Sequence, residues 1–275
     1  MKIKNTLTHS LLIIALLISG CEDKEAEEQL VVESFSITLV DKITTGDETQ
    51  SQPELIRFVT DELGVIVNSE QNSVEFINIT PSGITMSGQS VQITQDADAD
   101  ASSIDVSVDE SILAVVVSKG ACLRGELYLI NTSTLQKYGP YELGFNPDAV
   151  DIAVDNKFVV VVNEFDYEDG VDGGCQTLGF PGVSVYDISA GIDKATLVKD
   201  MKISHTGSNG NLAEPEGVKI APNGDTVYMT LQESNEMGWF SLSNPPDVLQ
   251  NKVTYSNPEH EPDGIWVNSN GTLIC

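Results

Sequence analysis

The chain has 275 residues, of which 42 are acidic and 14 are basic, and its formal net charge is −28 at pH 7. A charge of this sign repels polyanions, so nucleic acid and anionic membrane surfaces are poor candidates as partners of the folded part. Carboxylates that converge favour divalent cations instead, although a plain acidic surface that keeps the protein soluble explains most of these charges.

The first twenty residues have the three parts of a secretory signal peptide. Lys2 and Lys4 precede an apolar run from Leu11 to Ile18, and the small residues Ser19 and Gly20 follow it. The run is shorter than the roughly 20 apolar residues that a transmembrane helix needs. The sequence therefore predicts export, not a permanent membrane span.

Cys21 directly follows the signal. The segment Leu17-Ile18-Ser19-Gly20-Cys21 resembles the lipobox of bacterial lipoproteins. This resemblance implies that Cys21 carries a lipid such as palmitate and becomes the new N-terminus; an ordinary signal peptide with a chance cysteine is the alternative. Acyl chains on Cys21 would hold the protein to a membrane. The expected location is the bacterial cell envelope, with the outer membrane or cell surface favoured over the inner membrane.

A charged run from Glu22 to Glu28 comes next and contains no apolar side chain large enough to pack. Such a composition is typical of a solvated segment. We therefore expect an acidic tether over residues 21–29 and a folded domain over residues 30–275.

Short runs of β-branched residues between turn residues occupy the rest of the chain, and no convincing amphipathic helix follows the signal. The predicted fold class is therefore all-β. The runs that predict strands are, in chain order, Gly64–Val67, Ser73–Ile77, Ile112–Val117, Glu126–Ile130, Phe158–Val162, Gly182–Tyr186 and Thr226–Met229.

These runs recur in units that begin with a similar short segment. The five entry segments are Pro53–Ile56, Ala101–Ile104, Pro147–Val150, Pro215–Val218 and Pro262–Ile265. Three intervals between their starts fall in the forties, and the interval from Pro147 to Pro215 is one unit plus an insertion. A period in the forties with about four strands per unit is the signature of a β-propeller blade. A β-sandwich is the alternative, but it does not predict the recurring Pro-acid-x-aliphatic entry.

Two segments, Phe158–Glu164 and Pro215–Asn235, resemble the blades of YVTN-type bacterial surface propellers, particularly those of the choice-of-anchor group. The match covers roughly residues 50 to 275. It implies a propeller of about seven blades, in a group whose members are mostly of unknown biochemical role and whose relatives include some with esterase-like or phytase-like labels. Four units and half of a fifth are present, with Cys275 inside the second strand of the fifth, so we expect a fragment or a premature stop.

The second entry residue is acidic in four of the five units. Entry strands line the central channel of a propeller, so we expect this column to converge near one channel mouth. Repulsion among the carboxylates would be relieved by a bound cation or by raised pKa values. Entry residues that only form turns and face water are the alternative. The column consists of Glu54, Ser102, Asp148, Glu216 and Asp263.

An acidic, glycine-rich insertion runs from Glu164 to Cys175. Ca²⁺ prefers six to eight oxygen ligands in a flexible geometry, so this loop is a candidate calcium site, although its spacing matches no defined calcium loop. Another acidic run, Asp96–Asp100, lacks the Gly and Glu that an EF-hand needs and is expected to be a solvated loop. The candidate metal ligands are Glu164, Asp166, Asp169 and Asp172.

Three cysteines remain once Cys21 is assigned to the lipid, and export places them where disulfides persist. Cys122 and Cys175 fall in loops that follow the same strand of neighbouring predicted blades. A disulfide between them is therefore expected. Pairing of either residue with Cys275 is the alternative.

No zinc spacing, nucleophile elbow or phosphate-binding glycine loop is present, and His205 and His260 lie in segments that read as loops. The leading hypothesis is a lipid-anchored envelope propeller that binds a protein, glycan or small ligand through one mouth, without catalysis.

The alternative is a metal-dependent hydrolase of lactonase, esterase or phytase type that uses the channel carboxylates and a bound water. Basic residues that would hold an anionic substrate do not recur in one column, which argues against phytate. The residues considered are Lys119, Arg124, Lys157 and Lys219.

Overall fold

The computed structural model describes residues 53–120, 122–165, 179–204, 206–207, 212–256, 262–268 and 270–274. All of them belong to one compact unit, Leu39–Cys275. The predicted signal peptide, the lipid-bearing Cys21, the tether and the predicted domain start lie outside the described residues. Within the described part of the chain, no helix is long and apolar enough to cross a membrane.

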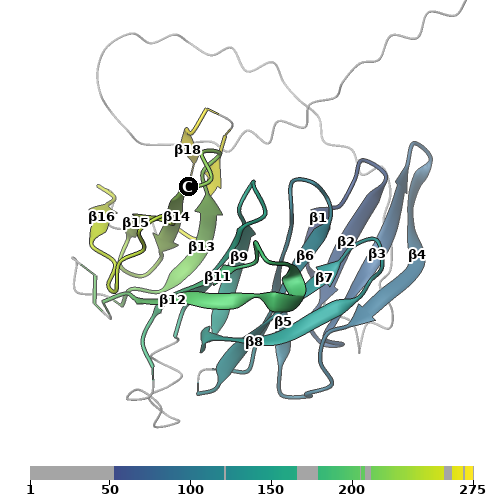
Figure 1. The fold of residues 1–275 in the computed structure, drawn as a ribbon, viewed down its shortest axis with the longest axis horizontal. Coiled ribbons are helices and arrows are strands. Elements are labelled where there is room, and N and C mark those ends of the chain that lie inside the picture. Colours follow the sequence, from purple (N-terminus) through teal and green to yellow (C-terminus); the bar gives the residue numbers. More distant parts are fainter. Residues whose placement is uncertain are drawn as a thin grey trace, which may run out of the picture. The chain divides into compact units, whose positions relative to one another are not determined.

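Four antiparallel sheets of four strands follow one another along the chain, and each is a simple meander (Figure 1). Blade one contains β1 (Pro53–Phe58), β2 (Leu63–Asn68), β3 (Ser73–Thr80) and β4 (Gly83–Gln92). Blade two contains β5 (Asp100–Val106), β6 (Ile112–Ser118), β7 (Arg124–Asn131) and β8 (Lys137–Phe145). The predicted all-β propeller fold is confirmed.

Blade three contains β9 (Pro147–Ile152), β10 (Phe158–Asn163), β11 (Gly182–Asp187) and β12 (Thr196–Lys202), with the 3₁₀ turn η1 (Ile192–Lys194) before its last strand. Blade four contains β13 (Pro215–Ile220), β14 (Thr226–Leu231), β15 (Glu236–Ser241) and β16 (Asn251–Thr254). The short pair β17 (Trp266–Val267) and β18 (Leu273–Ile274) follows. The predicted insertion lies between β10 and β11.

The second strands of blades two and three are apolar because both of their faces are covered. All seven residues of β6 are buried, and the same holds for all but the first residue of β10. Continuous apolar runs are typical of strands with two buried faces, whereas one-sided burial gives alternation. Separate hydrophobic clusters fill the spaces between blades one and two, two and three, and three and four. The blades are therefore held together mainly by apolar burial between sheets.

The innermost strands of successive blades lie next to one another, in the order β1, β5, β9, β13 and β17. Phe58 on β1 is 66% exposed, because no described blade packs against that face of blade one. Equivalent positions on β9 and β13 are Ile152 and Ile220, and both are buried. The entry strands thus line a common inner surface, as the sequence repeat predicts.

Candidate functional site

A β-bulge occurs at the same place in each of the first four inner strands. Pro53 and Leu55 pair with consecutive residues of β2, so Glu54 between them has no opposite partner. A bulge adds a residue to one strand and turns its side chain, and bulges are common beside functional sites. The residues placed in these bulges are Glu54, Ser102, Asp148 and, together with Gly217, Glu216.

Three of these bulges open into one pocket. Glu54, Ser69, Asp100, Ser102 and Asp148 line a cavity of about 310 Å³ where the inner strands begin. Ser69 Oγ donates a hydrogen bond of 3.0 Å to Glu54 Oε1. The lining offers carboxylates and hydroxyl groups and includes no basic side chain. We call the end of the inner strands with this pocket the mouth.

Glu216 on β13 donates a hydrogen bond to Asp148 on β9, which joins blades three and four at the mouth. Burial and the charges of Asp148, Glu164 and Asp263 raise the pKa of Glu216 to about 9. Burial also raises the pKa of Asp148, and the charge of Asp263 adds to this effect. Glu216 is therefore protonated at neutral pH, and its proton relieves the repulsion between the two carboxyl groups.

The structure thus brings the predicted column together in two overlapping groups. Glu54 and Asp148 line the same pocket. Glu216 of blade four donates a hydrogen bond to Asp148, and the charge of Asp263, in the segment after blade four, raises the pKa of Asp148. Ser102 also ties blade two to blade three, because its Oγ donates a hydrogen bond of 3.1 Å to the carbonyl oxygen of Pro147.

The residue that follows the four-residue entry segment is charged in each of the first four units, and sequence reasoning missed this column. Its members are Arg57, Asp105, Asp151 and Lys219. Arg57 Nε lies 3.8 Å from Asp105 Oδ1, and Lys219 Nζ pairs with the buried Asp151. Burial raises the pKa of Asp151 to about 7, although Lys219 opposes this shift. The signal was available, because Arg57 and Lys219 occupy the same repeat position. Arg57 and Lys219 therefore share a column, contrary to the expectation that basic residues do not recur in one.

Both aspartates of this column also connect neighbouring blades through the backbone. Asp105 Oδ2 accepts the amide hydrogen of Ile152 at 3.0 Å, and Asp151 Oδ2 accepts that of Ile220 at 2.6 Å. Hydrogen bonds to a charged acceptor are stronger than neutral ones. These hydrogen bonds therefore link blade two to blade three and blade three to blade four.

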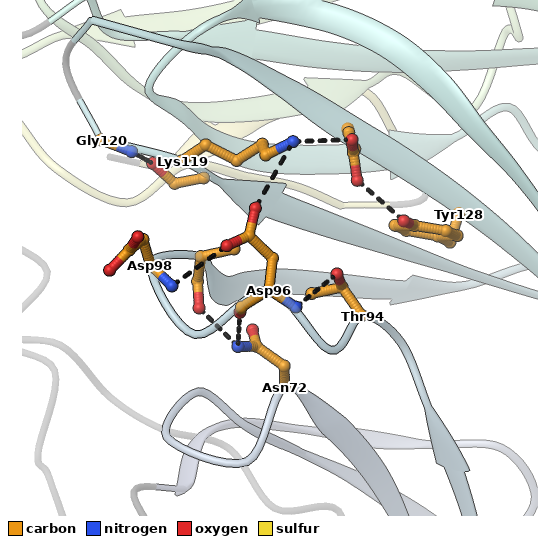
Figure 2. Close-up of polar contacts among 10 residues, drawn as sticks. Asn72, Thr94, Asp96, Asp98, Lys119, Gly120 and Tyr128 are labelled. Atoms are coloured by element: carbon orange, nitrogen blue, oxygen red, sulfur yellow. Dashed lines mark hydrogen bonds and ion pairs between the residues drawn. The ribbon is translucent and has the colours of Figure 1, made fainter.

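The acidic loop that leads into blade two is contacted by Lys119 and by Asn72 (Figure 2). Lys119 Nζ lies 3.7 Å from Asp96 Oδ2 and 3.0 Å from Glu126 Oε1. Tyr128 donates a hydrogen bond of 2.7 Å to the other oxygen of Glu126. Asp96 and Asp98 are exposed, as expected for a solvated loop. The ion pair with Lys119, which the sequence did not predict, links this loop to the end of β6, and Asn72 Nδ2 donates a further hydrogen bond of 3.2 Å to the carbonyl oxygen of Asp96.

Of the candidate calcium ligands, only Glu164 lies among the described residues; Asp166, Asp169 and Asp172 do not. Asn146 Nδ2 donates a hydrogen bond of 2.6 Å to Glu164 Oε2. The described ranges contain no group of three or more His, Cys, Asp or Glu side chains placed to hold a metal ion. The calcium site stays a prediction.

Cys122 is a disulfide-bonded cysteine. Cys175 and Cys275 lie outside the described residues, and so do His205 and His260. The pairing of Cys122 with Cys175 therefore stays a prediction.

Comparison with known proteins identifies the family. A model of the choice-of-anchor I domain matches residues 56–247, which is more than half of the chain. The chain belongs to this family. The match begins within β1 and ends between β15 and β16, so it includes most of the four blades.

Solved structures similar to this choice-of-anchor I protein include a β-propeller domain. Hydrazine synthase from Kuenenia stuttgartiensis matches with a TM-score of 0.59 and 13% identity, over 80% of this chain and 66% of that one. A functionally unknown protein from Desulfotomaculum acetoxidans matches with a TM-score of 0.57 and 12% identity, over 80% of this chain and 61% of that one. The β-propeller domain of Cps50 (Swd1) from Myceliophteria thermophila matches with a TM-score of 0.52 and 11% identity, over 76% of this chain and 62% of that one.

Identities this low show the fold alone, and the chain spans less than two thirds of the length of each of these structures. A search of curated proteins finds no match.

Proposed function

We propose that this choice-of-anchor I protein is a binding module of the bacterial cell envelope, held to the membrane by a lipid on Cys21. It recognises a protein, glycan or small ligand at the mouth and performs no catalysis. The group that enters the pocket is positively charged, because the lining supplies three carboxylates and no basic partner.

The repeated bulge is the observation that carries this proposal. A blade needs no bulge to pack against its neighbours, and an extra residue interrupts the ladder of backbone hydrogen bonds. Four successive blades nevertheless carry the bulge, and each bulge includes a residue with a carboxyl or hydroxyl side chain. Polar groups turned toward one pocket from several blades are suited to recognition of a ligand.

Binding of a cationic peptide tests the proposal. A fluorescently labelled oligolysine peptide is titrated into the mature protein and into a double variant, Glu54→Gln with Asp148→Asn. Removal of two charged hydrogen-bond acceptors should weaken binding about tenfold or more. A control double variant, Asp61→Asn with Glu62→Gln, changes the net charge equally at exposed positions on blade one, at the end opposite the mouth. Equal losses in both variants would mean that the peptide senses only the overall charge, and the proposal would then fail.

The calcium site proposed in the insertion after β10 has a separate test. Carboxylates of Glu164, Asp166, Asp169 and Asp172 that bind Ca²⁺ should raise the melting temperature once the free ion exceeds its dissociation constant. Melting temperatures measured with added Ca²⁺ and with a chelator give the comparison. Identical values would remove calcium from the proposed function.

A further inference from the structure

A second cavity lies in blade four, at the end of the blade opposite the mouth. It has a volume of about 430 Å³ and is lined by Phe240, Ser241, Asn244, Pro246, Gln250 and Asn251. The mouth end of β15 is Glu236, which pairs with Leu231, whereas Ser241 at the other end of β15 pairs with Thr226. The length of a strand therefore separates this cavity from the mouth, and we call it the blade-four pocket.

The first wall of the blade-four pocket is held by Asp225. Ser241 Oγ donates a hydrogen bond of 2.6 Å to Asp225 Oδ2, and the amide of Ser243 donates one of 2.7 Å to Asp225 Oδ1. The amide of Leu242 also donates to the carbonyl oxygen of Asp225, at 2.8 Å. The chain is thus fixed where it leaves β15.

The second wall is held by blade three. The backbone amide of Lys202 on β12 donates a hydrogen bond of 3.0 Å to the carbonyl oxygen of Asp247. The carbonyl oxygen of Lys202 accepts one of 2.8 Å from the backbone amide of Leu249. The loop between β15 and β16 is therefore tied at both ends before any ligand arrives. A pocket with fixed walls binds with a smaller loss of conformational entropy than a loop that must first become ordered.

The lining contains no charged side chain, although the chain as a whole carries a net charge of −28. A charged ligand would lose hydration there without gaining a partner. Three carboxamides, those of Asn244, Gln250 and Asn251, stand beside apolar surface from Pro246, whereas Phe240, which also lines the pocket, is only 3% exposed. The chemistry of the pocket therefore fits a ligand that is uncharged, has an apolar face and carries several hydrogen-bonding groups.

Two of the carboxamides are already oriented. Gln250 Nε2 donates to the carbonyl oxygen of Val248 at 3.1 Å, and Asn251 Nδ2 donates to that of Trp239 at 3.3 Å. Their side-chain oxygens accept no hydrogen bond within the described part of the chain. These oxygens are acceptors for hydroxyl groups, and each amide retains a second N–H to donate.

We propose that the blade-four pocket binds a neutral saccharide. Sugar hydroxyls both donate and accept hydrogen bonds, as carboxamides do, and the C–H face of a sugar ring packs against a proline such as Pro246. This inference is independent of ligand binding at the mouth, because the two sites share no residue.

The test uses saturation-transfer NMR and titration of the mature protein with glucose, galactose, mannose, N-acetylglucosamine and cellobiose. At least one of these neutral sugars should bind, and glucuronate and glucosamine, which are charged, should bind more weakly. Asn251→Ala and Gln250→Ala should each weaken binding about fivefold, the effect of losing one hydrogen bond. Both side chains are exposed, so neither variant should change the melting temperature by more than a few degrees.

Asn78→Ala serves as the matched control, because Asn78 is an exposed carboxamide on blade one. It should bind the sugar as the unmodified protein does, and so should the Glu54→Gln, Asp148→Asn variant of the mouth. The inference is overturned if no sugar in the panel binds, or if the Asn251 and Gln250 variants bind as well as the control.

Discussion

Replacement of Glu216 by glutamine should remove part of the pH dependence of stability. Glu216 has a pKa of about 9 in the folded protein, against an ordinary value of 4.5. A group whose pKa is raised by folding stabilises the protein fully below its unfolded pKa, and this contribution is lost as the pH rises through its folded pKa. The unmodified protein should therefore lose stability between pH 4.5 and about 9. Glutamine cannot ionise, yet it still donates a hydrogen bond to Asp148.

The size of the effect follows from the shift. At about 1.4 kcal/mol per pKa unit, the full change would amount to about 6 kcal/mol. Glu216 is only partly buried, so solvent screening reduces this value, and we expect about 2 kcal/mol. At pH 5 the two proteins should be equally stable, and at pH 9 the Glu216→Gln variant should be more stable by about 2 kcal/mol.

Urea denaturation at pH 5, 7 and 9 measures this difference. The exposed Glu62 is the control, because Glu62→Gln removes the same charge from the turn between β1 and β2, at the end of blade one opposite the mouth. Stability curves of the unmodified protein and the Glu216→Gln variant that run parallel across this pH range would refute the shared proton.

Three further predictions concern the anchor, the disulfide and the charged column. Labelled fatty acid should enter the protein through Cys21, and Cys21→Ser should release it from the membrane fraction; label that persists in the variant would contradict lipidation. Non-reducing peptide mapping should find Cys122 linked to Cys175, and separate peptides that are both alkylatable in the native protein would rule out the bridge. Asp151→Ala leaves Lys219 without its buried partner and should cost about 3 kcal/mol in urea denaturation. The same change at the exposed Asp155 should cost less than about 1 kcal/mol, and equal losses would show that the column does not pin the blades.

Much of the fold follows from local sequence patterns. Runs such as Ile112–Val117 predict β6 because β-branched residues suit a strand that is covered on both faces. The Pro-acid-x-aliphatic entry recurs at Pro53, Pro147 and Pro215 because each inner strand begins in the same environment. A repeat shows itself in the sequence when each unit meets the same packing constraints.

The mouth was only partly predictable. Repeat alignment indicates that Glu54, Asp148, Glu216 and Asp263 share one column, but it does not show which of them keeps a proton. That depends on burial and on the distance to other carboxyl groups, including Glu164, which belongs to a different repeat position. Charge balance in the column of Arg57 and Lys219 likewise becomes visible only when adjacent blades are placed side by side.

The sequence by itself determined the all-β class, the number of blades present and the column of polar entry residues, because these properties depend on contacts within one repeat. Only the tertiary structure decided the bulges at the mouth, the proton shared by Asp148 and Glu216, and the blade-four pocket. Each of these depends on groups that are distant in the chain, such as Lys202 and Leu249, and meet only after the blades have packed. Electrostatic and cavity effects arise from such distances in space, which no local pattern encodes.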